Sequence, residues 1–203
     1  MLLAFDTALF GLLNGRARSA VLDVVLPLFS DAWLLWVGAV LFLGGYAWYC
    51  RRNYGEALWR VIVLVMLLGL SVGVADMSCN VIKDEVGRYR PFQTVAGTHF
   101  FTPDRQWTVV DEPSYAPGSI GGSFPSSHAA TSMAVALVVS LLFRRSNPWI
   151  FALPLFVGWS RIYVGKHFPV DVVGGWCVGM LSVLVVWWGC HLLFIRFFNR
   201  RNT

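Results

Sequence analysis

Three side chains that can carry out phosphoryl chemistry lie close together late in this 203-residue chain: Arg161, His167 and Asp171. His167 can act as a nucleophile or a proton carrier, and Asp171, four residues later, can hold the second ring nitrogen of that histidine. Arg161 offers a planar fork that suits phosphate oxygens. Ionisable groups are costly beside apolar segments, so this set predicts a functional site. A plainer reading is an interfacial histidine followed by an aspartate that favours a helix dipole.

Two further polar clusters lie upstream. Lys83 and Arg90 stand in the pattern K-x6-R-P after one apolar segment, and Ser126, Ser127 and His128 stand in the run FPSSH before another. A serine commonly caps a helix start, where free N–H groups and a positive dipole end favour a bound phosphate. Taken alone, these clusters also fit a basic collar at a membrane interface and a capped helix with a chance histidine.

The composition indicates an integral membrane protein. The chain is 57% hydrophobic with a mean hydropathy of +0.61, and it contains several long stretches without charge. We predict an all-α helical bundle in a single domain, 1–203, with about five transmembrane spans. These lie at 32–50, 57–77, 128–143, 148–163 and 170–195. Residues 1–30 hold two apolar runs, 5–13 and 20–29, which predict short interfacial helices; a sixth span is the alternative.

Small residues and cysteines add two expectations. The pairs Gly69/Gly73 and Gly175/Gly179 have the spacing that lets helices approach closely. The four cysteines form no C-x-x-C pair, which argues against zinc or redox chemistry. The net charge of +5 comes from residues scattered at span ends, so nucleic acid is not an expected partner.

The basic residues at the span ends suggest an orientation. One side of the membrane would hold tight arginine pairs next to the spans, which favours that side as cytoplasmic. The residues concerned are Arg51, Arg52, Arg60, Arg144, Arg145, Arg196, Arg200 and Arg201. The three polar clusters and the long 92–123 loop would then face outward. This loop has no evident periodicity, and it is either a substrate-selecting segment or a covering loop.

The order of the spans brings the three clusters to one membrane face. Cations and N–H donors gathered there would stabilise the equatorial oxygens of a phosphoryl group in transfer. One histidine would attack phosphorus and the other would protonate the leaving oxygen.

The three motifs resemble those of the type 2 phosphatidic acid phosphatase (PAP2) family, lipid phosphate phosphatases related to vanadium haloperoxidases. That family carries K-x6-R-P, then P-S-G-H, then S-R-x5-H-x3-D. The first and third motifs match at every fixed position, and the second differs once, where Ser127 replaces the usual glycine. Its side chain is expected to crowd the phosphate cradle. The resemblance covers most of the chain but not residues 1–30 or the 92–123 loop.

The resemblance implies a role for each matching residue. His167 would form a phosphohistidine, Asp171 would orient His167, and His128 would protonate the leaving group and then activate water. The implied phosphate ligands are Lys83, Arg90, Ser126, Ser127 and Arg161. No metal and no cofactor are implied.

The implied activity is that of a membrane lipid phosphatase in a bacterial cytoplasmic membrane, with its site facing outward. Its partners would be the bilayer and a lipid phosphate or diphosphate. Undecaprenyl diphosphate ranks first, followed by phosphatidylglycerol phosphate or phosphatidic acid, and then the lipid A 1-phosphate. A lipid phosphotransferase and a non-catalytic lipid-phosphate binder or transporter are the alternatives.

Overall fold

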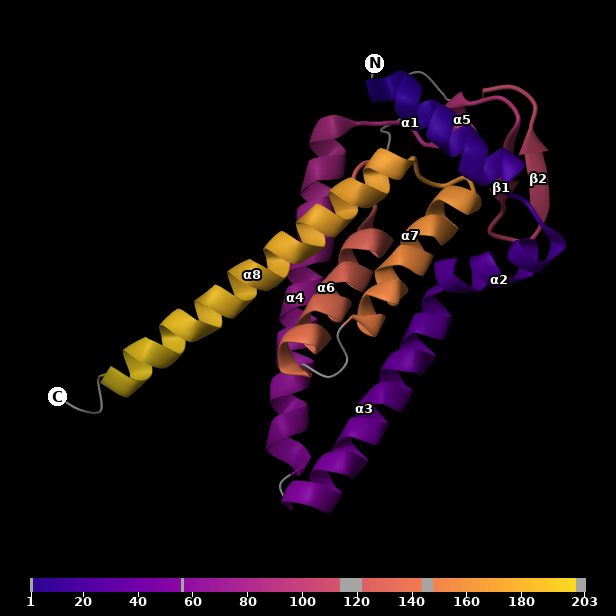
Figure 1. Ribbon diagram of the computed structural model, residues 1–203. Coiled ribbons are helices and arrows are strands. Elements are labelled where there is room, and N and C mark those ends of the chain that lie inside the picture. The colour runs from indigo at the N-terminus through magenta and orange to yellow at the C-terminus, as the bar shows by residue number, and fades with distance from the viewer. Residues whose placement is uncertain (1, 56, 114–121, 144–147, 200–203) are drawn as a thin grey trace.

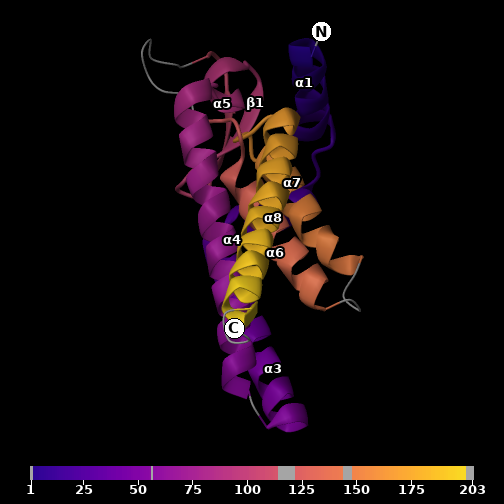
Figure 2. The ribbon, with the colours of Figure 1, turned by 90° about the vertical axis from the view of Figure 1, so that its left-hand side faces the viewer.

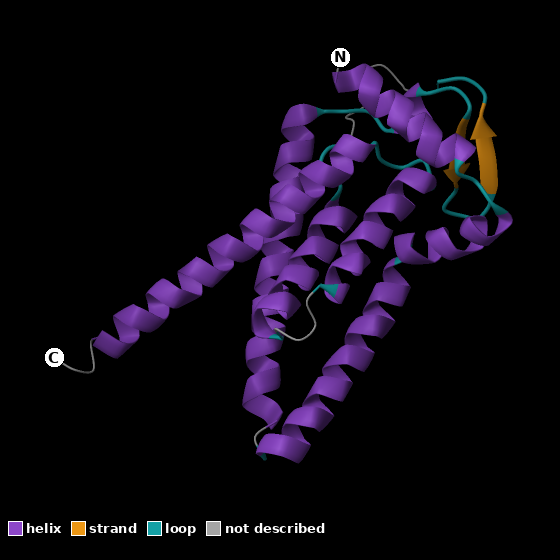
Figure 3. Ribbon diagram, viewed as in Figure 1, coloured by secondary structure: helices purple, strands orange, loops and turns teal. Residues whose placement is uncertain are grey.

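The computed structural model describes residues 2–55, 57–113, 122–143 and 148–199, and it is almost entirely helical (Figures 1 and 3). Three helical segments come first: α1 (Leu2–Gly11), the π-helical turn η1 (Leu12–Arg16) and α2 (Ala20–Ser30). The longer helices are α3 (Ala32–Tyr54), α4 (Ala57–Val86), α6 (Ser127–Leu142), α7 (Ala152–Tyr163) and α8 (Pro169–Asn199). A 3₁₀ turn, η3 (Trp149–Phe151), precedes α7.

All five predicted apolar segments are helical, but three of the helices, α3, α4 and α8, extend beyond the C-terminal ends of the predicted spans. Helix α4 continues to Val86 rather than ending at 77, which places Lys83 in its last turn. By length and hydropathy, two of the described segments could cross a membrane alone, Leu58–Thr94 and Pro169–Leu192. The count of five spans and the interfacial position of α1 and α2 remain predictions. Arg144–Arg145 and Arg200–Arg201, two of the arginine pairs predicted to face the cytoplasm, lie outside the described residues.

The expectation of an irregular 92–123 loop is wrong for its first half. Helix α5 (Pro91–Thr94) leads into an antiparallel hairpin of β1 (Thr98–Phe101) and β2 (Trp107–Val110). Aromatic and β-branched residues in both strands favour this pairing, and Arg105 takes the left-handed conformation in the turn. Residues 114–121 lie outside the described part of the chain. The hairpin, α5 and α1 gather at one end of the bundle in two perpendicular views (Figures 1 and 2).

Helix α6 is the centre of the bundle and contacts α4, α7 and α8. Its face toward α8 is lined with alanine, and Gly175 and Gly179 of α8 lie directly against the α6 backbone. A Cβ at Gly179 would meet the Ala130 main chain. The expected close approach is therefore made at this pair. It is not made at Gly69 and Gly73 of α4, where a Cβ would meet nothing within 4 Å.

Candidate active site

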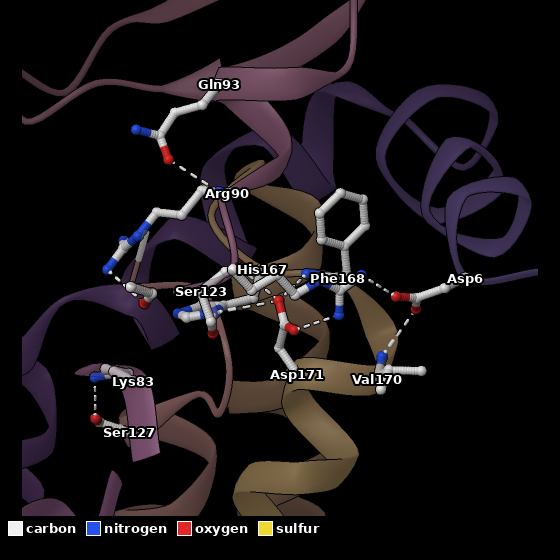
Figure 4. A network of polar contacts seen from close by, with 12 residues as sticks. Asp6, Lys83, Arg90, Gln93, Ser123, Ser127, His167, Phe168, Val170 and Asp171 are labelled. Carbon is white, nitrogen blue, oxygen red and sulfur yellow. Dashed lines mark hydrogen bonds and ion pairs between the residues drawn. The ribbon is translucent and has the colours of Figure 1, made fainter. Parts of the chain in front are cut away.

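The three motifs come together at the end of the bundle that carries the hairpin. Lys83 comes from the end of α4, Arg90 from the turn before α5, and Ser126 caps the start of α6. Arg161 lies in the last turn of α7, and His167 lies in the short segment that leads into α8. Figure 4 shows the side chains of Lys83, Arg90, Ser127, His167 and Asp171 around this point. Asp171 follows in the first turn of α8, so all eight sequence-predicted site residues lie at this end of the bundle.

The ring of His167 is held in one orientation and one tautomer. It is only 2% exposed, and Nδ1 lies 2.7 Å from the main-chain oxygen of Ser123. A carbonyl oxygen can only accept a hydrogen bond, so Nδ1 must carry the proton and Nε2 keeps its lone pair. Burial, followed by the charges of Arg161 and Arg90, lowers the pKa of His167 to about 4 against the opposing influence of Asp171. The ring is therefore neutral at physiological pH, as a nucleophile must be.

Asp171 lies beside His167 but does not make the direct hydrogen bond that was expected. Its Oδ2 atom is 3.7 Å from Nδ1, beyond hydrogen-bond range. The carboxylate instead accepts hydrogen bonds from the Ser123 hydroxyl at 2.5 Å and the Phe168 N–H at 2.8 Å, and it pairs with Arg88 at 2.6 Å. Ser123 thus contacts both groups, because its hydroxyl binds Asp171 and its carbonyl binds His167. Asp171 is thus linked to His167 through Ser123, and its negative charge lies near the ring.

Two buried polar groups in the site have no hydrogen-bond partner among the residues that the structure describes. Arg161 is 5% exposed and its Nε atom makes no hydrogen bond, and the hydroxyl of fully buried Ser126 is equally unpartnered. Burying such groups unpaired is costly, most of all for a guanidinium. Both groups come from motif positions, and Ser126 stands at the N-terminus of α6. Together they form a site that an oxyanion would satisfy.

The Ser127 side chain was expected to crowd the phosphate cradle, and in the structure it contacts Lys83. Its hydroxyl accepts a hydrogen bond from the Lys83 ammonium at 2.5 Å, so it holds a site cation in place. Arg90 is anchored at 3.3 Å to the carbonyl of Gly122. His128, half-buried in the first turn of α6, lies near enough to Lys83 and His167 for charge on either to act on its ring.

Three functional groups were not identified from the sequence: Arg88, Ser123 and Lys166. Arg88 stood between the two motif cations and was given no role, although it is the residue that pairs with Asp171. Lys166 precedes His167 and forms no ion pair with any described residue. Burial, followed by the charges of Arg161 and Arg90, lowers its pKa to about 8. Its position next to His167 is the only sequence signal that could have pointed to it.

Ser160, which matches the family motif, contributes to packing instead. Its hydroxyl donates to the Leu26 carbonyl at 2.6 Å and lies 2.6 Å from the Ser30 hydroxyl, which ties α7 to α2.

Comparison with known proteins places these features in a family context. The model of the PAP2 superfamily matches residues 64–194. A lipid A 1-phosphatase of Rhizobium johnstonii is 30% identical over 201 residues, covering 95% of this chain and 78% of that protein. An undecaprenyl-diphosphatase of Sulfolobus acidocaldarius is 28% identical, covering 63% of this chain and 61% of that protein. The crystal structure of Aquifex aeolicus LpxE superposes with a TM-score of 0.63 at 23% identity, covering 90% of this chain and 94% of that one.

Proposed function

Because the chain belongs to the PAP2 superfamily, a family of membrane lipid phosphatases, we propose that it removes the terminal phosphate from a lipid diphosphate, with undecaprenyl diphosphate as the first candidate. The observation that carries this proposal is that the Arg161 Nε atom and the Ser126 hydroxyl have no hydrogen-bond partner among the described residues. A buried guanidinium nitrogen and a buried hydroxyl in this state, beside a neutral histidine, suit a phosphoryl group that arrives with the substrate.

The first chemical step forms a phosphohistidine. The lone pair on His167 Nε2 attacks phosphorus and the bond from phosphorus to the leaving oxygen breaks. His128, which takes up a proton when the anionic substrate binds beside it, donates that proton to the leaving oxygen. The imidazole becomes cationic as the P–N bond forms. The Asp171 carboxylate, 3.7 Å away, and the Ser123 carbonyl stabilise that charge.

The second step returns the enzyme to its starting state. His128, now neutral, takes a proton from water, and the water oxygen attacks the phosphorus. The P–N bond breaks and inorganic phosphate leaves. Throughout both steps Lys83, Arg90 and Arg161 balance the charge on the equatorial oxygens, aided by Ser126 and the N–H of Ser127. Since these groups supply the charge stabilisation, we propose that the reaction needs no divalent metal.

The number of cations favours a diphosphate. Lys83, Arg90, Arg161 and Lys166 converge on the site, and none forms an ion pair within the described part of the chain. Four cations suit a diphosphate, because the phosphate that stays on the lipid product is also negatively charged. The lipid A 1-phosphate is the second candidate, because the alignment with the Rhizobium lipid A 1-phosphatase covers 95% of this chain.

The same proposal includes a location. Bacterial relatives and the apolar helices indicate a bacterial membrane protein. We place it in the cytoplasmic membrane with the hairpin end facing outward. The described arginines Arg51 and Arg52 lie in the last turn of α3, at the opposite end of the bundle (Figure 1).

The test is phosphate release by purified protein from undecaprenyl diphosphate, lipid A, phosphatidylglycerol phosphate and phosphatidic acid, each with and without EDTA. We expect fastest release from undecaprenyl diphosphate, an unchanged rate in EDTA, and no turnover by His167→Ala. Fastest release from lipid A would select the second candidate. Lipid binding without release would indicate a binder, and phosphate passed to another lipid would indicate a phosphotransferase. Near-normal release by His167→Ala would overturn the mechanism.

A further inference from the structure

Asp6 of α1 lies outside every motif and outside the residues that match the family, yet it is buried against Arg88 and Val170, the latter close in the chain to His167. Its side chain is 2% exposed, and both carboxylate oxygens are engaged. Oδ2 pairs with the Arg88 guanidinium at 2.5 Å, and Oδ1 accepts the main-chain N–H of Val170 at 2.9 Å. Figure 4 shows Asp6 beside Val170, with Asp171 close by.

A continuous set of short contacts leads from Asp6 to His167. Arg88 uses one terminal nitrogen for Asp6 and the other, at 2.6 Å, for Asp171. Asp171 accepts the hydrogen bond of the Ser123 hydroxyl, and the Ser123 carbonyl is bound to Nδ1 of His167. Arg88 reaches Ser123 by a second route as well, because its main-chain oxygen accepts the Ser123 N–H at 2.9 Å.

The position of Arg88 in the chain explains why it needs a second carboxylate. It lies in the non-helical segment 87–90 between α4 and α5, after Gly87, which has a positive φ of 59°. The segment lies outside both helices, so the orientation of the Arg88 guanidinium depends on its own side-chain contacts. The Arg88 guanidinium also lies 4.3 Å from the centre of the Phe168 ring, but a ring face does not fix its rotation about that axis. A fork held at both ends by carboxylates has one orientation.

Apolar packing supports the same placement of α1. The ring of Phe10, one turn after Asp6, is 5.4 Å from the ring of Phe168, and the two are part of one buried cluster with Ile162 and Val172. Helix α1 is therefore packed directly on the segment that carries His167. The sequence predicted short interfacial helices for this region, or a sixth span, and no part in the site.

We propose that α1 is part of the catalytic apparatus and that Asp6 is a positioning residue, which fixes Asp171 and His167 by holding Arg88. This inference rests on the proposed phosphatase activity and adds to it an element that the family motifs do not include. Asp6 touches neither substrate nor the reacting atoms, so its loss should slow the chemical step and leave substrate binding intact.

The primary variant is Asp6→Asn, which keeps the size of the side chain and removes its charge. We expect kcat to fall by about 10- to 100-fold, as happens when a partner that orients a catalytic group is lost, and KM to stay unchanged. The matched control is Asp23→Asn. Asp23 is also an N-terminal carboxylate, paired with Arg18 and hydrogen-bonded to Tyr163, but it lies outside the path to His167. This control should keep its kcat.

A double-mutant cycle separates positioning from general destabilisation. If Asp6 acts through Asp171, adding Asp6→Asn to Asp171→Asn should lower kcat no further. Additive losses, or an Asp6→Asn variant with wild-type kcat, would overturn the inference while leaving the phosphatase assignment standing. A wild-type protein without lipid phosphatase activity would overturn both.

If Asp6→Asn does not purify as a folded protein, Arg88→Lys takes its place in the cycle. Lysine keeps the positive charge but cannot hold two carboxylates in a fixed fork. The same loss of kcat, again not additive with Asp171→Asn, is expected. A wild-type rate for Arg88→Lys would show that the two-ended clamp is dispensable.

Discussion

The contact between α6 and α8 gives a sharp test of the fold through Gly179→Ala. A Cβ at this position would meet the Ala130 carbonyl oxygen, with the Ala130 carbonyl carbon at 3.0 Å and its Cα at 3.2 Å. These are main-chain atoms of a helix, so they cannot rotate away as a side chain could. The two helices must separate for the variant to fold, and the alanine-lined contact along them would loosen.

The size of the effect follows from two opposing contributions. Overpacking a tight contact costs about 1–3 kcal/mol, and the rigid backbone here favours the upper part of that range. Replacing glycine by alanine within a helix returns about 1 kcal/mol through helix propensity. The net loss in unfolding free energy is therefore about 1–2 kcal/mol, which for a chain of this length lowers the midpoint of thermal unfolding by about 2–8 °C.

Thermal unfolding in detergent measures this directly, and the same helix supplies the control. Gly189 also lies in α8, but a Cβ there would meet nothing within 4 Å. Gly189→Ala should therefore keep or slightly raise the unfolding midpoint. A Gly179→Ala protein that unfolds at or above the wild-type temperature would show that α8 does not lie against the α6 backbone as described.

Three further predictions concern the site and its orientation. Ser127→Val and Ser127→Gly both remove the acceptor for the Lys83 ammonium, but only valine places a β-branched side chain in the phosphate cradle. Ser127→Val should therefore slow turnover by about 10²–10³-fold while Ser127→Gly remains active; equal rates for the two variants would place residue 127 outside the site. The native pKa of His167 is about 4 against an ordinary 6.5, so protons bind the unfolded chain more strongly between these values. Unfolding free energy should fall as pH is lowered through that window, by up to about 1.4 kcal/mol per unit, and thermal unfolding of His167→Gln should lack this slope. In a background without native cysteines, Asp104→Cys in the exposed hairpin turn should react with an impermeant thiol reagent on intact spheroplasts while Asn53→Cys should not; the reverse pattern would invert the topology.

The sequence predicted those features that follow from short-range patterns along the chain. Apolar runs predicted the helices, and the direction in which each helix leaves the bundle predicted that Lys83, His128 and His167 would meet. The membership of the family predicted from the three motifs is confirmed. The hairpin escaped prediction because its two strands are only four residues each and show no strict alternation.

The contacts that the sequence could not supply are those between distant parts of the chain. Asp6 and Arg88 are 82 residues apart, and nothing in the neighbourhood of either specifies the other. From the sequence, an aspartate in a short apolar helix is interpreted as a polar residue at a membrane surface. The contact between Ser123 and His167 could not be predicted for a different reason. It uses the main-chain oxygen, which every residue possesses.

That main-chain contact has a genetic consequence. Whichever amino acid occupies position 123, its carbonyl oxygen is still present, so no single codon change there can delete the acceptor for Nδ1. The tautomer that leaves the lone pair on Nε2 is therefore set by the path of the backbone and is protected from ordinary point mutation at position 123. Substitutions at position 123 should therefore affect activity through the hydroxyl that binds Asp171. Among all replacements, threonine, which keeps a hydroxyl, should retain the most activity.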